Sequence, residues 1–560
     1  SQAMSASSEG DVANRIAAQF RAYGSSGIIS QAELSTILLK LHPAWSEELV
    51  QLVIVESHAV RNGDLVDCLA FLRWIFASDP DTSTSQSQTE VAVPVEEGCC
   101  IVLTEERGIT GRQLGGLKGR IHDYCEQAER PASDALTVNL YDVVKHVVMP
   151  ATQARQCSYV ELVADGPQVP DWFVSHWWGE PVHDFISCIQ QHARDRHCPE
   201  ATAYWVCAYA NNQWNISADI GTGPENSSFR KAMRLAKGTV SVLDSGAVCY
   251  TRIWCIYEVY VTVVASVAER SDYLFDIYTV SKDDRKPFPI GITDGYLPGD
   301  GAEEKRARKK RHRESKFPLQ LVQKALDIEV ETARASSDKD RVSILRTICN
   351  LSDANAPPPK SHPCYDVLNA RLRGRFAAAS WVKAAASKVA LETHGEALAS
   401  SDLDELELHF GGSCQQSLTD DAVAVLGRSL PATLHRLFLG FEGCKQLTDA
   451  SMAAIAAQLP TLTSLAFLEL RFSNCKRLTD ACLVSLSPGL GMLQSLEHLE
   501  VEVRGCKELT DMGVTALARG LLMLRGLRYL KLDLAGCKRI TNTGKQAVRS
   551  TLDGRGTEIH

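Results

Sequence analysis

Apolar and polar residues alternate in short stretches toward the C-terminal end of the chain, and the stretches return at a constant interval. The cysteines that follow them stand 31 residues apart, at Cys444, Cys475, Cys506 and Cys537. A period of two places three apolar side chains on one face of a short strand. Each cysteine is followed by a Thr-Asp or Thr-Asn pair and then by a helical pattern. We therefore predict a unit of strand, turn and helix that is repeated along residues 401–560.

One such unit is too small to close its own core, whereas three or more stacked units bury a continuous one. An earlier copy begins at Leu406 and reaches Cys414, as expected of a capping unit. The Cys-x-x-Leu-Thr-Asp signature resembles the cysteine-containing class of leucine-rich repeats. The resemblance implies a solenoid with parallel strands on its concave face. The cysteines could form a metal ladder, but thiols that face inward one strand apart are better explained as part of the core.

Polar residues at the outward strand positions carry charges of both signs. They are His409, Arg471, Glu500, Glu502, Lys531 and Asp533. A surface of mixed sign argues against a nucleic-acid groove and favours a protein partner on the concave face.

Residues 98–285 alternate short apolar runs with helical patterns. The first apolar run leads into the sequence Ser-His-Trp-Trp at 175–178, and a later helix opens with Trp254-Cys255-Ile256-Tyr257-Glu258. Strands that alternate with helices imply a parallel sheet, in which the loops at the carboxyl ends of the strands form the site. The predicted strands are 172–174, 203–210 and 239–243, and the predicted helices between them are 182–192 and 228–236.

This order resembles the TIR domain of Toll and interleukin receptors and of plant resistance proteins. The resemblance is carried by Phe-Val-Ser-His at the end of the first strand and by Trp254-Cys255-x-x-Glu258 at a helix start. It implies a flavodoxin-like sheet and, in the enzymatically active members, an NAD nucleohydrolase whose catalytic residue is the glutamate of the motif, here Glu258. It also implies self-association through this domain. The residues expected to bind the substrate are Ser175, His176, Trp177, Trp178 and Trp254.

A single carboxylate is chemically sufficient for this role. Cleavage of the bond from nicotinamide to ribose passes through an oxocarbenium-like centre, which a nearby carboxylate stabilises. The leaving group already carries positive charge, so no second acid is needed, and tryptophan faces can stack on the nicotinamide or the adenine. The alternative is a non-catalytic adaptor, in which Glu258 only favours the start of a helix and the tryptophans belong to the core.

One group of residues in this region has a spacing that suggests zinc. Within the predicted helix, Cys188 and His192 share a face, but the adjacent residues His197 and Cys198 cannot easily meet at one tetrahedral centre. Cys207 with His176 could form a nucleophile and base, but Cys207 falls in an apolar run, where thiols are usually inert. We expect no metal site and no resident cofactor, with NAD as the candidate substrate.

The N-terminal helical region resembles a pair of EF-hands. Gly27, Ile29 and Glu33 fall at the sixth, eighth and twelfth positions of one loop, and Gly63 and Leu65 at the sixth and eighth of another. Calcium needs several carboxylate oxygens from the other loop positions, and these loops supply too few. The sequence therefore argues against calcium binding and favours a degenerate pair kept for packing or docking.

A basic run at 305–313 lies between the central region and the repeats. Runs of this kind are typical of nuclear import signals or nucleic-acid patches, whereas the flanking glutamates favour a solvated linker. With 68 acidic and 59 basic residues the formal net charge is −9, which gives the whole chain no attraction to nucleic acid or anionic lipid. We expect no membrane span and no secretion signal, with reduced cysteines and a cytoplasmic location, or a nuclear one if the basic run is used for import.

Taken together, the patterns predict a multidomain α/β protein that combines a parallel-sheet domain, a repeat solenoid and a small all-α module. The predicted function is that of a signalling or receptor-like protein whose repeats bind a partner and whose central domain hydrolyses NAD. A scaffold that uses both domains only for protein binding is the alternative. The expected parts are a disordered tail or cloning remnant at 1–10, an EF-hand-like module at 11–77, a linker at 78–97, the TIR-like domain with an N-terminal extension at 98–285, a basic linker at 286–316, a helical bridge at 317–400 and leucine-rich repeats at 401–560.

Overall fold

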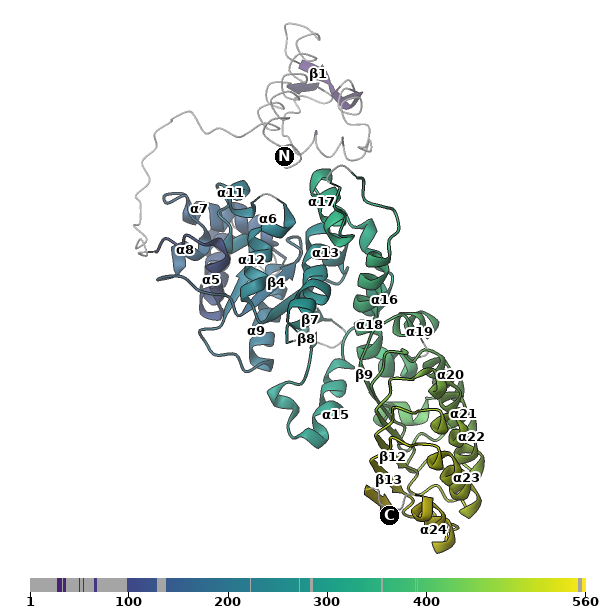
Figure 1. The fold of residues 1–560 in the computed structure, drawn as a ribbon. Helices are drawn as coiled ribbons and strands as arrows, with labels where there is room; N and C mark the ends of the chain where they lie inside the picture. The colour runs from purple at the N-terminus through teal and green to yellow at the C-terminus, as the bar shows by residue number, and fades with distance from the viewer. Residues whose placement is uncertain are drawn as a thin grey trace. The chain divides into compact units, whose positions relative to one another are not determined.

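The computed structural model divides the chain into two compact units, Ser1–Val95 and Glu96–His560, and each is considered by itself (Figure 1). Among the described residues, no helix is both long enough and apolar enough to cross a membrane. The described residues are 28–32, 34–36, 50, 54, 65–67, 98–127, 137–221, 223–270, 272–282, 286–353, 356–387, 389, 391–551 and 556–559.

In the first unit, strand β1 (Ile28–Ser30) pairs antiparallel with β2 (Leu65–Asp67), and Ile29 lies opposite Val66. The loop positions that would hold calcium, Glu33 among them, lie outside the described residues, as do the tail at 1–10 and the linker at 78–97. The prediction on calcium therefore stays a prediction.

The second unit is mixed α/β, and its first six-stranded sheet has the order β3-β5-β4-β6-β7-β8. The four central strands run parallel, and the two edge strands are antiparallel to their neighbours. From β4 the chain moves outward to β5 and then crosses back to β6 on the other side, so the connections diverge between β4 and β6. The strands are β3 (Ile109–Thr110), β4 (Trp172–His176), β5 (Ala203–Val206), β6 (Gly238–Leu243), β7 (Leu274–Ser281) and β8 (Phe288–Ile292).

Helices cover both faces of this sheet. One face packs on α5 (Gly111–Gln127) and α9 (Val182–Asp195), and the other on α12 (Ser228–Leu235) and α13 (Ile253–Tyr260). Because successive strand residues point to opposite faces, Trp172 and Val174 of β4 join the α9 side, whereas Phe173 joins the α13 side.

Two predicted segments differ from the structure. The strand expected at 203–210 ends at Val206, and the short helix α10 (Cys207–Ala210) takes its place. The segment 286–316, expected as a linker, contains β8, a short 3-10 turn η7 (Pro298–Asp300) and helix α15 (Glu303–Glu314). The apolar residues of β8 complete the sheet edge, and buried polar contacts hold α15 against it.

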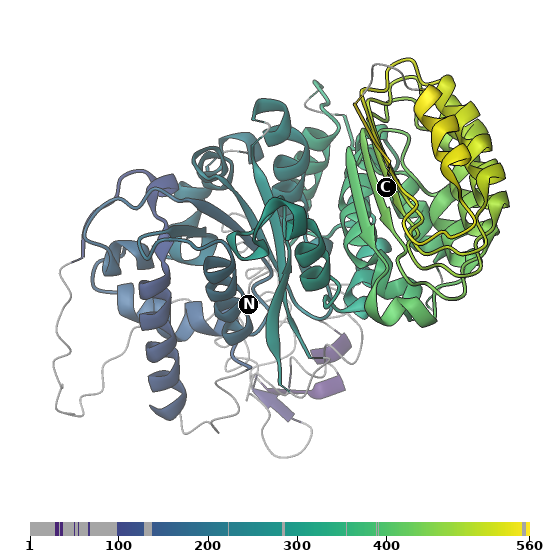
Figure 2. The ribbon, with the colours of Figure 1, turned by 90° about the horizontal axis from the view of Figure 1, so that it is seen from below.

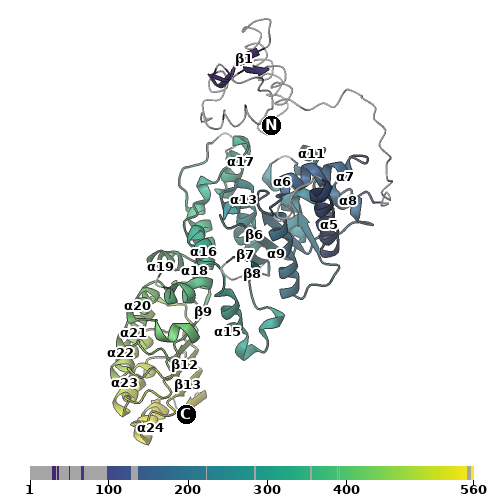
Figure 3. The same cartoon turned by 180° about the vertical axis from the view of Figure 1, so that it is seen from behind.

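The second sheet contains the repeats and is all-parallel, in the order β14-β13-β12-β11-β10-β9. Equivalent positions of neighbouring repeats lie opposite one another, such as Leu437 and Leu468. The helices form a column beside the strands (Figures 2 and 3). The strands are β9 (Glu405–His409), β10 (Arg436–Gly440), β11 (Phe467–Arg471), β12 (His498–Glu502), β13 (Tyr529–Asp533) and β14 (Gly556–Ile559), and the helices are α20 (Asp420–Arg428), α21 (Asp449–Gln458), α22 (Asp480–Gly491), α23 (Asp511–Leu522) and α24 (Asn542–Thr551).

The Thr-Asp signature joins each repeat to the next. The Asp480 carboxylate accepts hydrogen bonds from the backbone N–H and the hydroxyl of Thr510, at 2.7 and 2.5 Å. Asp449 does the same for Thr479, at 2.8 and 2.6 Å. The threonine in turn caps its own helix, as Thr510 does by accepting from Met512 N–H. The signature is therefore a chain of charge-assisted hydrogen bonds along the stack.

The repeat cysteines also point across the stack. The Cys475 thiol donates to the Phe441 carbonyl at 3.1 Å, and the Cys506 thiol to the Phe472 carbonyl at 3.3 Å. Burial raises the pKa of both thiols to about 12. A thiol that stays protonated and donates a hydrogen bond to a carbonyl is a poor metal ligand, because metals bind the thiolate. This geometry favours the core interpretation of the cysteines.

A helical region between the two sheets contributes to one apolar core that extends from Phe173 into the repeats. Its long helix α18 buries Phe376 and Trp381 completely. Arg371 of α18 hydrogen-bonds to the Val263 carbonyl at 2.5 Å and forms an ion pair with Asp402 at 2.6 Å. The helices of this region are α16 (Leu319–Leu326), α17 (Asp338–Ile348), α18 (Pro363–Ala386) and α19 (Glu392–Ala399).

We expect Asp480→Ala to lower the free energy of unfolding by about 1–3 kcal/mol, because it leaves two donors of the next repeat without their carboxylate. Urea titration of the full chain measures this effect. The control Asp421→Ala removes an exposed carboxyl of α20 and should change stability by less than about 1 kcal/mol. Equal losses in the two variants would contradict the proposed role of the Thr-Asp chain.

Candidate functional site

In open α/β sheets, ligands bind where the connections diverge, outside the carboxyl ends of the strands. In this sheet that point lies between β4 and β6. Ser175 and His176 are the last two residues of β4, so they lie at this point. The motif glutamate, Glu258, reaches the same place from α13, since the Ser175 side chain is close enough to lower the pKa of its carboxyl. The sequence-based grouping of Ser175 with Glu258 is thus present in the structure.

Helix α13 begins where it does because its first turn is tied to a neighbouring segment. Arg252 precedes the helix in an extended conformation and forms a bridge with Arg334, whose carbonyl accepts from Ile253 N–H at 2.8 Å. The fixed start places Glu258 one and a half turns into the helix, on the side that faces the sheet. Glu258 is only 4% exposed.

The electrostatics of Glu258 are those of a neutral acid. Burial raises its pKa to about 8, and the nearby Ser175 side chain offsets only part of this shift in pKa. Its Oε2 atom has no hydrogen-bond partner among the described residues. A buried carboxyl oxygen without a partner is costly to the fold, and such groups concentrate at functional sites.

His176 lies on the other side of the sheet from Ser175, because consecutive strand residues alternate. Its Nδ1 atom is 3.2 Å from Oε1 of Glu180, and its ring packs 4.6 Å from Phe185 of α9. Burial lowers the pKa of His176 to about 3 and raises the pKa of Glu180 well above its ordinary value. Burial therefore disfavours the charged form of both residues. Glu180, which follows the strand in a Gly-Glu pair, is a residue that the sequence reasoning had not selected.

The three tryptophans are engaged with protein rather than presented to a ligand. Trp254 stacks on Phe229 with ring centroids 5.1 Å apart, and its indole N–H donates to Asp340 at 3.3 Å. Trp178 donates to the Cys207 sulfur at 3.1 Å. The ring of Trp177 lies against Gly179 so closely that a Cβ there would meet it at 2.2 Å.

The loops beside this point are held down by the N-terminal extension of the domain. Leu140 N–H donates to the Trp178 carbonyl at 2.8 Å, and Trp214 donates to Thr152 at 3.0 Å. Glu258 does not line the two cavities of about 670 and 660 Å³ described in this unit, and only 4% of its surface is exposed. The described conformation is thus closed around Glu258.

Cys207 and His192, the candidates for a nucleophile and a zinc ligand, are both engaged within the fold. Burial raises the pKa of Cys207 to about 12, which makes it a weak nucleophile at neutral pH. The two ring nitrogens of His192 lie 3.0 Å from the Tyr204 hydroxyl and 3.1 Å from the Asp276 carboxylate, so both are already used. Cys207 is therefore poorly suited to act as a nucleophile, and His192 has no free ring nitrogen with which to bind zinc.

The second candidate site is the outward face of the repeat sheet. A row of stacked groups crosses it, in which the Arg436 guanidinium lies 3.7 Å from the Phe467 ring centre. Phe467 stacks on His498 at 4.2 Å, and His498 stacks on Tyr529 at 4.4 Å. Arg436 is exposed, and the three rings are half-buried. We call these four residues the aromatic row.

Charged residues lie in register beside the aromatic row. The Lys531 ammonium bridges Glu500 and Glu502, at 3.0 and 3.1 Å. Burial raises the pKa of Glu469 to about 7, although its ion pair with Arg471 opposes the shift. The three carboxylates approach one another within 4.8 Å, but each already forms an ion pair with Lys531 or Arg471.

No protein-family model matches the chain, and no curated protein matches it. Its function must therefore be argued from these two sites.

The buried state of Glu258 predicts a pH-dependent stability. The pKa is raised from 4.5 in the unfolded chain to about 8 when folded, so the stability contributed by the neutral carboxyl is lost as pH rises through this window. We expect the unfolding free energy of Glu258→Gln to rise relative to that of the parent protein by about 1.4 kcal/mol for each pH unit between about pH 5 and 8. Urea titrations at several pH values measure this gain.

Glu500→Gln is the matched control. Burial alone would raise the pKa of Glu500, but His498 and Lys531 outweigh it and lower the pKa to about 2. Its stabilising contribution is lost only as pH falls below the ordinary range of a carboxyl, so this variant should show a constant difference from the parent between about pH 5 and 8. A constant difference for Glu258→Gln as well would contradict a buried, protonated Glu258.

Proposed function

We propose that this chain is a signalling protein that holds a protein partner on the outward face of the β9–β14 sheet. In this proposal the sheet and its helices form a leucine-rich-repeat solenoid, and the central domain is of the TIR-like type. The observation that carries the proposal is the aromatic row. Half-buried aromatic rings capped by an arginine are the groups that contribute most at protein interfaces.

The charges around the aromatic row support a protein rather than a nucleic acid as the partner. Glu500 and Glu502 lie beside Lys531, and Glu469 lies beside Arg471, so no stripe of one sign follows the strands. A nucleic-acid groove needs a continuous basic path to its phosphates. A protein surface of alternating sign complements the pairs that are present.

Substitution within the aromatic row tests this proposal. We expect Arg436→Ala with Tyr529→Ala to abolish capture of the partner by the immobilised full chain, because it removes both ends of the row. Quantitative mass spectrometry of proteins retained from a cell extract measures the loss.

The matched control is Met512→Ala with Met523→Ala, which removes two exposed side chains from the helical side of the repeats. The partner should be retained in full by this variant. A set of captured proteins that is the same for the parent and both variants would refute the assignment of the outward face.

A second function, hydrolysis of NAD, is favoured by one observation, the unpaired Oε2 of Glu258 beside Ser175 at the carboxyl end of β4. In the reaction, the bond from ribose C1′ to the nicotinamide nitrogen breaks and its electron pair stays with nicotinamide. Water adds at C1′ and loses a proton. The ionised Glu258 would stabilise the positive charge that develops on the ribose.

The closed conformation sets the conditions for that activity. Because Glu258 is covered and largely protonated near neutral pH, the proposal requires that self-association or partner binding open the loops held by Leu140 and Trp214. Until then the central domain acts only by binding.

Incubation of concentrated full-length protein with NAD tests this second function by release of nicotinamide. We expect release in the self-associated protein and a loss of at least about 100-fold in Glu258→Gln, as for other carboxylates that stabilise charge in a transition state. Glu508→Gln, which makes the same chemical change at an exposed position outside the aromatic row and its charges, should retain the parent rate. Absence of release under all conditions, or equal rates in both variants, would leave only the binding function.

A further inference from the structure

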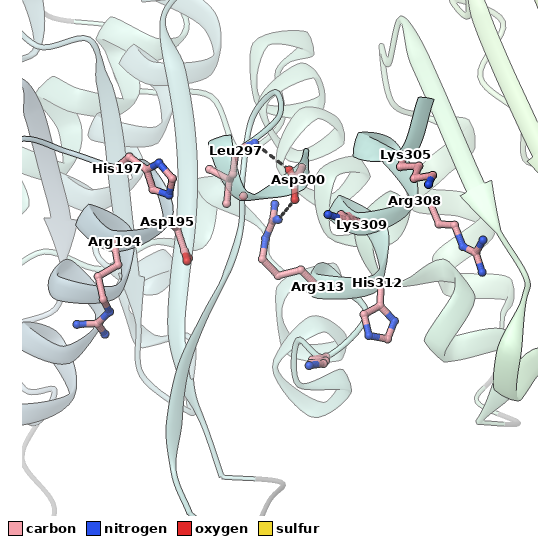
Figure 4. A pocket seen from close by; sticks show the side chains of 12 residues that line it. Arg194, Asp195, His197, Leu297, Asp300, Lys305, Arg308, Lys309, His312 and Arg313 are labelled. Carbon is pink, nitrogen blue, oxygen red and sulfur yellow. Dashed lines mark hydrogen bonds and ion pairs between the residues drawn. The ribbon is translucent and has the colours of Figure 1, made fainter. Parts of the chain in front are cut away.

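A cavity of about 670 Å³ lies between the end of α9, the turn η7 and helix α15 (Figure 4). Most of the side chains around it are cationic. The basic residues that matter here are Arg194, Lys305, Arg308, Lys309, His312 and Lys316.

Helix α15 presents four of these residues, Lys305, Arg308, Lys309 and His312, because its opposite side is fixed. Lys310 is buried and donates to the Thr293 carbonyl and to Glu314, and Glu314 accepts from Thr293 N–H at 3.0 Å. Lys310 and Arg311 lower the pKa of Glu314 against the opposing effect of burial, so the carboxylate stays charged. With this face anchored, positions 305, 308, 309 and 312 form one stripe at helical spacing, and Lys316 follows just beyond the end of the helix.

The cations of the stripe are not neutralised by the protein. Within the described part of the chain, Arg194, Lys305, Arg308, Lys309 and Lys316 form no ion pair. Like charges three and four residues apart on a helix repel one another. An anion in the cavity would remove this repulsion.

The two carboxylates that border the cavity are already occupied. Asp300 pairs with Arg313 and accepts from Leu297 N–H at 2.8 Å. Asp195 accepts from the Tyr278 hydroxyl at 2.8 Å and from Gln191 at 2.7 Å. Arg313 therefore neutralises Asp300, and the cations that line the cavity outnumber the remaining carboxylate, Asp195.

We propose that this cavity binds a small polar molecule that carries several phosphate groups, of the inositol polyphosphate class. Lysine and arginine are the usual partners of phosphate, and the volume suits a small ligand. Leu297 is the only apolar side chain among the described residues that line the cavity, and Phe, Tyr and Trp are absent from this lining, so a nucleobase finds only the imidazole rings of His197 and His312 to stack on. The acidic chain as a whole also repels a long polyanion.

Calorimetric titration of the full chain with inositol hexakisphosphate tests the site. We expect micromolar or tighter binding at about 0.15 M salt, weakening as salt is raised. Arg308→Ala with Lys309→Ala should reduce the affinity by at least about 10-fold, because it removes two phosphate contacts from the centre of the stripe. The ligand should raise the melting temperature of the parent protein and leave that of the double variant unchanged.

The control variant, Lys445→Ala with Lys476→Ala, removes the same charge from exposed loops of the repeats and should bind within about 2-fold of the parent, as remote surface charges are screened. Absence of binding, or equal binding by the cavity and control variants, would overturn the proposal. Tighter binding of a single-stranded RNA than of inositol hexakisphosphate would overturn it as well.

Two further arms identify the source of the phosphates. The free headgroup of phosphatidylinositol bisphosphate and vesicles that contain this lipid are compared in the same protein. Binding of both indicates a membrane lipid, and binding of the free headgroup alone indicates a soluble ligand. Both results support the cavity, provided that Arg308→Ala with Lys309→Ala abolishes them.

Discussion

Burial of one shared apolar core is the constraint on which the second unit depends. A single repeat cannot enclose its own leucines, so the first repeats must cover theirs with something else. Helix α18 does this, with Phe376 and Trp381 fully buried in the core that extends from β4 to the last repeats. The same packing reaches α13 through Tyr250, whose ring lies 6.1 Å from Phe376. The repeats, the helical region and the α13 side of the first sheet therefore share one apolar core.

The repeats and the strand–helix alternation could be predicted from the sequence because both rest on periodicity. The interval of 31 residues and the apolar positions of β10–β13 are local patterns that tertiary contacts reinforce. Helix α15 was not predicted, because a run of basic residues has no apolar period. The Lys310–Glu314 pair that holds the helix could not be inferred either, because it depends on a tertiary contact with Thr293. The separation of Ser175 from His176 follows from strand alternation and could have been inferred. The closure around Glu258 could not, because it depends on residues as distant as Leu140 and Trp214.

Charge is distributed in opposite ways at the two ends of the α/β domain. At the carboxyl end of β4, burial disfavours the charged forms of Glu258, His176 and Glu180 by raising the pKa of the two carboxyls and lowering the pKa of the imidazole. At the end of α9, the cations that face the cavity are mostly exposed and remain charged without partners. The first arrangement suits a group that becomes reactive only when it is opened. The second suits a ligand that arrives already charged.

The cavity and the repeats are connected through α15. This helix contacts β9, and the carboxylates Glu405 and Glu407 of β9 are close enough to raise the pKa of Tyr296 beside the cavity, in addition to the effect of burial. Arg306 of α15 packs on the same tyrosine ring at 4.4 Å. A polyanion that neutralises the α15 stripe therefore changes the potential at the acidic edge where the first repeat begins. Since coupling between two sites needs an interaction that differs between the bound and free states, this edge is where occupancy of the cavity would alter partner binding on the repeat sheet.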